Sequence, residues 1–339
     1  MNDKSKYELQ LLFFQKLKSG LPAHLSLVNE LSEILQISSD GAYRRLRGET
    51  ALTMDELFKV CAFFKVSPEM MVGNDSTQVT FSFTPLSVSE KQFDRYFKGL
   101  YEQLKMISSA KDHHLYFTAE ETPIFHFFNY PALTAFKIYY WNKCILNSQE
   151  YADRKFEPAT VDPELVALGK KIFEEYNKVT CTEIWSEKTI AGVLKQFEYV
   201  LETSNFVRRE DAEQVLAEIE QMVAHLRKAT ELGYKFDPNQ PSHQPCAPYT
   251  FYQLDIMMGN ITVYVKLGEL RQVFLAFHSF NTLATAHPLF SQETENWLNN
   301  MLKRATLISG TAEKQREKFF GAIAKEIQKT RDKMVLFSA

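Results

Sequence analysis

Cysteine and glycine are scarce in this sequence, and each scarcity excludes a class of site. Four cysteines occur among 339 residues, and none belongs to a Cys-x-x-Cys pair, which excludes zinc-finger and thioredoxin-like sites. Twelve glycines form neither a Walker motif nor a dinucleotide-binding fingerprint. We therefore expect free thiols, as in the reducing cytosol, with no bound metal and no cofactor.

Segments of the kind that enter membranes are also lacking. The first ten residues, MNDKSKYELQ, are polar and contain no signal peptide. The most apolar run, residues 123–146, is interrupted by Lys137 and Lys143, and a charge near its middle argues against a membrane-spanning helix. We expect a cytoplasmic chain without a membrane partner. The aromatic residues of this run are typical of a buried core, and they also suit a pocket for an apolar ligand.

Catalytic signatures are missing as well. The eight histidines are scattered in apolar or turn settings and form no metal-binding pattern, and there is no G-x-S-x-G nucleophile motif. The adjacent carboxylates Glu120-Glu121 and Glu174-Glu175 are typical of solvated surfaces rather than acid–base pairs. The sequence gives no indication of an enzyme.

A helix-turn-helix pattern is present at residues 27–48. Apolar residues recur at helical spacing from Leu27 to Leu35, and the period breaks directly afterwards. Ser38 then suits the N-cap of a second, short helix, because its hydroxyl can accept a free backbone N–H. Gly48 is placed to end that helix in the left-handed conformation.

The second helix is expected to have an inner and an outer face. With Ala42 facing inward, Leu46 falls beside it at about 100° per residue, and polar side chains fall on the opposite arc. Guanidinium groups on that arc suit phosphates and guanine edges, with which they pair bidentately. The residues expected to contact DNA are Ser39, Asp40, Tyr43, Arg44 and Arg47, with Arg45 on the flank within reach of a phosphate.

Further helix signals surround this pattern. Thr53-Met-Asp-Glu56 is a capping box, Ser67-Pro68-Glu69 is an N-cap followed by proline, and residues 7–18 are amphipathic. Residues 1–73 are therefore predicted to form a five-helix domain.

The order and spacing of these helices in residues 7–73 resemble the lambda-repressor/Cro-like (XRE-type) helix-turn-helix family. The resemblance implies that Ser38 to Arg47 is a recognition helix that enters the major groove of double-stranded DNA. It also implies a homodimer that reads two half-sites.

Charge does not favour nucleic acid over the whole chain. The net charge is −3, and residues 1–73 contain nine basic and nine acidic side chains. Attraction to DNA must come from the local cluster of Arg44, Arg45 and Arg47. We expect modest non-specific affinity with a strong dependence on salt.

The remaining chain is expected to be mainly α with a C-terminal α+β part. Residues 74–88 have the composition of a linker with a possible strand ending at Phe83, and residues 89–339 follow as a regulatory or dimerisation region. The elements expected in this region are a helical block at 163–232 with helices at about 163–178, 183–203 and 206–232, an antiparallel meander of three strands at 249–277, and C-terminal helices at 291–333, the first capped by Ser291.

Two functions remain open at this point. The leading hypothesis is a sequence-specific DNA-binding transcriptional regulator whose large remainder dimerises or senses a small-molecule or protein effector. The alternative is an interaction scaffold that binds another protein through the helical block.

Overall fold

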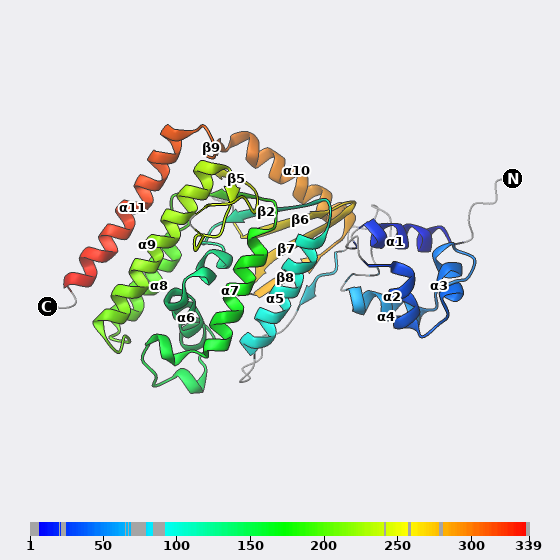
Figure 1. Ribbon diagram of the computed structural model, residues 1–339, viewed down its shortest axis with the longest axis horizontal. Coiled ribbons are helices and arrows are strands. Elements are labelled where there is room, and N and C mark those ends of the chain that lie inside the picture. Colours follow the sequence, from blue (N-terminus) through cyan, green and yellow to red (C-terminus); the bar gives the residue numbers. More distant parts are fainter. Residues whose placement is uncertain are drawn as a thin grey trace.

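The computed structural model has a small helical head beside a larger body, as Figure 1 shows. It describes residues 7–19, 21, 25–64, 66, 68, 79–83, 92–240, 242–256, 259–277 and 281–336. We call residues 7–64 the head and residues 79–336 the body.

The head is a bundle of short helices around one apolar core. Its described helices are α1 (Glu8–Ser19), α2 (Leu27–Leu35), α3 (Ser39–Leu46) and α4 (Met54–Phe64). Phe13 and Leu31 are fully buried at its centre, because each helix turns one apolar stripe inward. These four helices lie where the sequence predicts them. The fifth, expected from Ser67-Pro68-Glu69, falls outside the described residues apart from Pro68.

The described strands of the body form one mixed sheet. They are β1 (Ser82–Phe83), β2 (His113–Ala119), β3 (Cys181–Trp185), β4 (Tyr234–Lys235), β5 (Ala247–Gln253), β6 (Thr262–Leu267), β7 (Leu270–Phe277), β8 (Asn281–Thr285) and β9 (Thr306–Leu307). Their order is β1-β8-β7-β6-β2-β3-β5-β4, with β9 also beside β5. β3 pairs in parallel with β2 and β5, and the other pairings are antiparallel.

The expected antiparallel meander over residues 249–277 is wrong in its first strand. β5 pairs in parallel with β3, and both β2 and β3 separate it from β6. The antiparallel run is β6, β7 and β8 instead. Alternating hydrophobicity identifies a strand, but it does not select the neighbour with which that strand pairs.

The predicted helical block at 163–232 contains a strand. Its second helix, expected from residue 183, begins only at Ala191 as α8 (Ala191–Glu202), because β3 occupies residues 181–185. All residues of β3 are buried, as is usual for a parallel strand that is covered on both faces. The block is therefore not a separate helical unit, and its helices connect and cover strands of the sheet.

The predicted linker, residues 74–88, is partly built into the body. β1 adds an edge strand to the sheet by pairing with β8, with Ser82 opposite Ala284 and Phe83 opposite Leu283. The Ser82 hydroxyl also donates to the Ala284 carbonyl at 3.1 Å. This pairing fixes the chain that leaves the head to one edge of the sheet.

Helices cover both faces of the sheet (Figure 1). The other described helices are α5 (Gln92–Ser109), α6 (Pro131–Tyr140), α7 (Pro163–Asn177), α9 (Arg209–Leu232), α10 (Pro288–Arg304) and α11 (Glu313–Leu336), with short turns at Ile124–Asn129, Trp141–Ile145, Gln149–Tyr151 and Pro158–Thr160. Leu298 of α10 packs with Ile184 and Tyr264 on one face, and the remaining long helices of the body pack on the other. Of the described helices, none is long and apolar enough to cross a bilayer.

The first C-terminal helix begins earlier than the sequence suggested. We expected Ser291 to be its cap, but Ser291 lies buried inside α10. The cap is His287, whose ring accepts a hydrogen bond from the backbone N–H of Phe290, and Pro288 takes the first helical position. The helix ends at Arg304 because residues 306–307 pair with β5 as β9.

The aromatic run at residues 123–146 is buried, as expected for a core. Phe127, Phe128, Phe136 and Tyr139 are each at most 2% exposed. They belong to a continuous apolar cluster that extends from α5 to α11 across one face of the sheet.

We predict that Gly99→Ala stabilises the protein by about 0.5–1 kcal/mol, whereas Gly169→Ala does not. Both glycines lie inside helices, α5 and α7, where alanine is favoured over glycine by that amount. A methyl group at Gly99 would meet nothing within 4 Å, but at Gly169 it would approach the Thr134 methyl to 3.2 Å and the Phe128 ring to 3.4 Å. Urea unfolding at pH 7 measures both variants, and equal shifts would contradict this account.

Candidate nucleic-acid interface

Local chemistry fixes both ends of α3. The Ser38 hydroxyl accepts a hydrogen bond from the Gly41 backbone N–H at 3.2 Å, which satisfies one of the free donors at the start of a helix. Gly48 follows the helix with φ of +70°, a conformation that glycine adopts without steric cost. Both caps were predicted from the sequence, and both are confirmed.

The predicted faces of α3 match its burial in the structure. Ala42 is fully buried, and Tyr43 is 51% exposed. The exposed residues of α3 and its C-cap are Ser39, Asp40, Tyr43, Arg44 and Arg47. In Figure 1, α3 lies on the side of the head that faces away from the body. The outer arc of this helix is therefore accessible to a large partner.

Arg45 differs from the expectation that it reaches a phosphate. Its guanidinium donates to both carboxylate oxygens of Glu56, at 3.2 and 2.6 Å, and to the Gly41 carbonyl at 3.1 Å. Only 15% of the Arg45 side chain is exposed. Glu56 also forms the predicted capping box with Thr53, since each side chain accepts the other residue's backbone N–H. Arg45 thus joins α3 to α4.

Gln10 of α1 supports α3 through hydrogen bonds, a role that no sequence pattern indicates. Its amide nitrogen donates to the Arg45 and Thr50 carbonyls at 2.7 and 2.9 Å. Its amide oxygen accepts from the Leu52 N–H at 2.8 Å. One buried side chain therefore satisfies three backbone groups, one in the last turn of α3 and two between α3 and α4, which holds the end of α3 in place.

The C-terminal end of the outer arc of α3 carries two exposed guanidinium groups, those of Arg44 and Arg47. Arg44 has no ion-pair partner among the described residues, and Arg47 has an exposed partner, Glu49, at 3.1 Å. Exposed pairs of this kind contribute about 0–1 kcal/mol, so a phosphate can displace Glu49. Asp40 lies in the first turn, where the helix dipole favours a carboxylate.

A cluster of titratable groups in the body surrounds Glu183, which is 0% exposed. His126 Nε2 lies 2.9 Å from its carboxylate, and Trp185 Nε1 donates to it at 2.7 Å. The Tyr176 hydroxyl also donates to the Glu183 carboxylate. The centre of the Tyr176 ring lies 3.3 Å from the Lys235 ammonium. The Lys235 ammonium itself donates to the backbone carbonyls of Tyr176 and Val179. These side chains are all buried, as expected for a structural histidine and its partners rather than for an accessible reactive site.

Burial by itself would raise the pKa of Glu183, but its neighbours reverse the shift. The charge and hydrogen bond of His126, the Tyr176 hydroxyl and the Lys235 ammonium together hold the pKa of the Glu183 carboxyl below its ordinary value of 4.5. The carboxylate is therefore ionised in the folded protein at neutral pH.

The other sequence expectations concern metals, thiols and relatives. All four cysteines are free, as predicted. Within the described ranges, no group of three or more His, Cys, Asp or Glu side chains is arranged to hold a metal ion. No protein-family model, curated protein or solved structure matches this chain.

We predict that Arg45→Ala destabilises the head by about 1–3 kcal/mol, since it leaves the largely buried Glu56 carboxylate without its partner. Arg44→Ala is the matched control, and we expect it to change stability by less than about 0.5 kcal/mol because Arg44 is exposed. Hydrogen exchange of the α3 and α4 amides reports on the head alone. Equal protection in the two variants would show that the Arg45–Glu56 contact is dispensable.

We predict that Glu183→Gln lowers the free energy of unfolding by about 3 kcal/mol at pH 7, because it removes the charge that the buried donors satisfy. A lowered carboxyl pKa stabilises the fold above the unfolded value of 4.5, and this stabilisation is lost as the pH falls through the folded value. The difference between wild type and variant should therefore shrink below pH 4.5.

Urea unfolding at pH 7 and at pH values below 4.5 measures that difference. Exposed Glu174→Gln is the control for a charge change on the surface of the body, and its effect should stay within about 0.5 kcal/mol. A Glu183→Gln difference that is constant with pH would contradict the assigned pKa shift.

Proposed function

We propose that this protein is a DNA-binding transcriptional regulator whose head reads double-stranded DNA through α3. The observation that supports the proposal most directly is the outward position of Tyr43, Arg44 and Arg47 on a capped helix that faces away from the body. In this proposal Ser39 and Asp40 lie at the entry of the helix into the groove, and Arg45 supports the helix rather than contacting DNA.

The chemistry of this arc suits duplex DNA. An α-helix fits the major groove, where arginine pairs bidentately with guanine O6 and N7. Arginine also pairs with phosphate oxygens, and such contacts fix the register of a protein on the duplex. Arg44 and Arg47 are three residues apart and therefore lie on the same side of α3. They can act on one groove together.

One head alone presents few base-reading groups, so the proposal includes a homodimer. Two copies bound to half-sites one helical turn apart would add their binding energies. The body would supply the contacts between the copies in the cytoplasm.

The scaffold alternative has weaker support from the body. Helices α7, α8 and α9 contribute to the apolar cluster on one face of the sheet, and the inner side of α9 is buried along its length, from Ala212 to Thr230. This leaves only the outer sides of these helices for another protein.

We predict that Arg44→Ala combined with Arg47→Ala weakens binding to a genomic operator at least tenfold and reduces the slope of log K against log salt concentration. Each phosphate contact removed lowers that slope by about 1. Fluorescence anisotropy over a salt series, with fragments selected from the genome of the source organism, measures both quantities.

The matched control is Arg209→Ala combined with Arg227→Ala, which removes two exposed arginines from the body. We expect it to leave affinity and slope unchanged. If both double variants behaved alike, or if the wild type ignored duplex DNA at low ionic strength, the assignment of α3 would be wrong.

A further inference from the structure

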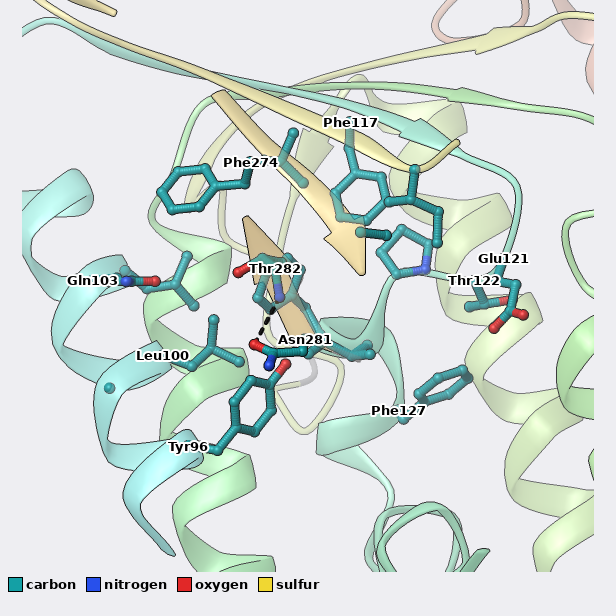
Figure 2. Close-up of a pocket in the computed structure, with 18 of the residues that line it drawn as sticks. Tyr96, Leu100, Gln103, Phe117, Glu121, Thr122, Phe127, Phe274, Asn281 and Thr282 are labelled. Atoms are coloured by element: carbon teal, nitrogen blue, oxygen red, sulfur yellow. Dashed lines mark hydrogen bonds between the residues drawn. The ribbon is translucent and has the colours of Figure 1, made fainter. Parts of the chain in front are cut away.

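The body contains a cavity of about 280 Å³ between α5 and the sheet. Figure 2 shows Tyr96, Leu100 and Gln103 of α5 on one side, and Phe117 and Phe274 of the sheet on another. The exposed residues Arg95 and Glu121 are also part of its lining, so the cavity reaches the surface. Most of its wall is apolar, including Ile107, Val263 and Val265.

Lys137 places a positive charge in this apolar wall. It lines the cavity and is only 3% exposed. Its ammonium donates to the neutral amide oxygen of Gln196, and it lies 4.7 and 5.1 Å from the ring centres of Phe127 and Trp141. Within the described residues it has no ion-pair partner.

Leaving a buried ammonium without an anion is costly. Burial lowers the pKa of Lys137 to about 8, opposed by the negative charge of Glu121. Glu121 itself is exposed, and its side chain rests against Gly192. A carboxylate brought into the cavity would supply the missing anion at a place where water is largely excluded.

We propose that this cavity binds a small apolar carboxylate, with the ligand carboxylate on Lys137 and Gln196 and its hydrocarbon body against α5 and the sheet. A cavity of about 280 Å³ lies at the small end of ligand pockets, which measure roughly 300–1,000 Å³. Medium-chain fatty acids and aromatic carboxylates have this size.

Strands β8 and β1 form part of the cavity wall, and they connect the cavity to the head. Asn281, Thr282 and Ala284 of β8 line the cavity, and so does Ser82 of β1. β1 belongs to the segment that leaves the head, and it is held by pairing with β8. A ligand that shifts β8 therefore changes how the head is anchored. This coupling rests on the proposed DNA-binding function, whereas the ligand site does not.

The test uses the full chain with octanoate as the probe and 1-octanol as its uncharged counterpart, measured by titration calorimetry. We expect octanoate to bind with one site per chain, and at least tenfold more tightly than octanol. Failure of octanoate to bind, or equal affinity for the two probes, would overturn the inference.

Two variants separate the roles of charge and space. Lys137→Met should weaken the binding of octanoate at least tenfold and leave the affinity for octanol within about twofold. Lys195→Met, at an exposed position on α8, should change neither affinity.

Gly99→Leu is designed to fill the cavity from the side of α5. Gly99 lines the cavity, and a Cβ atom at this position would meet no other atom within 4 Å. This substitution should abolish binding of both probes while the thermal unfolding temperature stays at or above that of the wild type.

The coupling has its own readout. Octanoate should change the DNA dissociation constant of the wild type at least threefold and leave that of Gly99→Leu unchanged. Octanoate binding without an effect on DNA would overturn the coupling and leave the ligand site in place. A chain that binds octanoate but no duplex DNA would refute the proposed function alone.

Discussion

The body depends on the way in which one buried carboxylate is satisfied. Glu183 lies in β3, between the two parallel neighbours of that strand. Its partners come from different elements: His126 from the turn at Ile124–Asn129, Tyr176 from α7, and Trp185 from β3 itself. An unpaired carboxylate at this depth would cost several kcal/mol. These contacts join the turn, α7 and β3 to one another, so polar contacts as well as apolar area connect the layers of the body.

Features that depend on neighbouring residues were predictable from the sequence. The caps of α3, the capping box of α4 and the inward position of Ala42 involve groups within a few residues of one another, and all three are present. The aromatic run at residues 123–146 is a core segment, as its composition indicates. Exposure of the outer arc of α3 follows from the same local periodicity.

Features that depend on long-range pairing were not predictable from one sequence. β3 shows no alternation of apolar and polar residues, because a central parallel strand is buried on both faces. It also has a glutamate at its centre, which hides it further from a search for apolar strands. β6 is the next described strand after β5 along the chain, but β5 pairs in parallel with β3 instead, so closeness in the sequence was misleading. Arg45 sits beside Arg44 in the sequence, but its partner, Glu56, lies in the next helix. The cavity combines residues from Ser82 to Ala284, which no local pattern connects.

Gln10 has a consequence for the thermodynamics of any complex that α3 forms. Its amide joins α1 to backbone groups 35 to 42 positions away, so the Arg45 carbonyl in the last turn of α3 and the chain that follows the helix already have partners in the free protein. Association at this helix does not have to order the backbone, and less conformational entropy is lost. The head would dock as a rigid body, and the heat-capacity change would report the surface removed from water rather than folding coupled to binding.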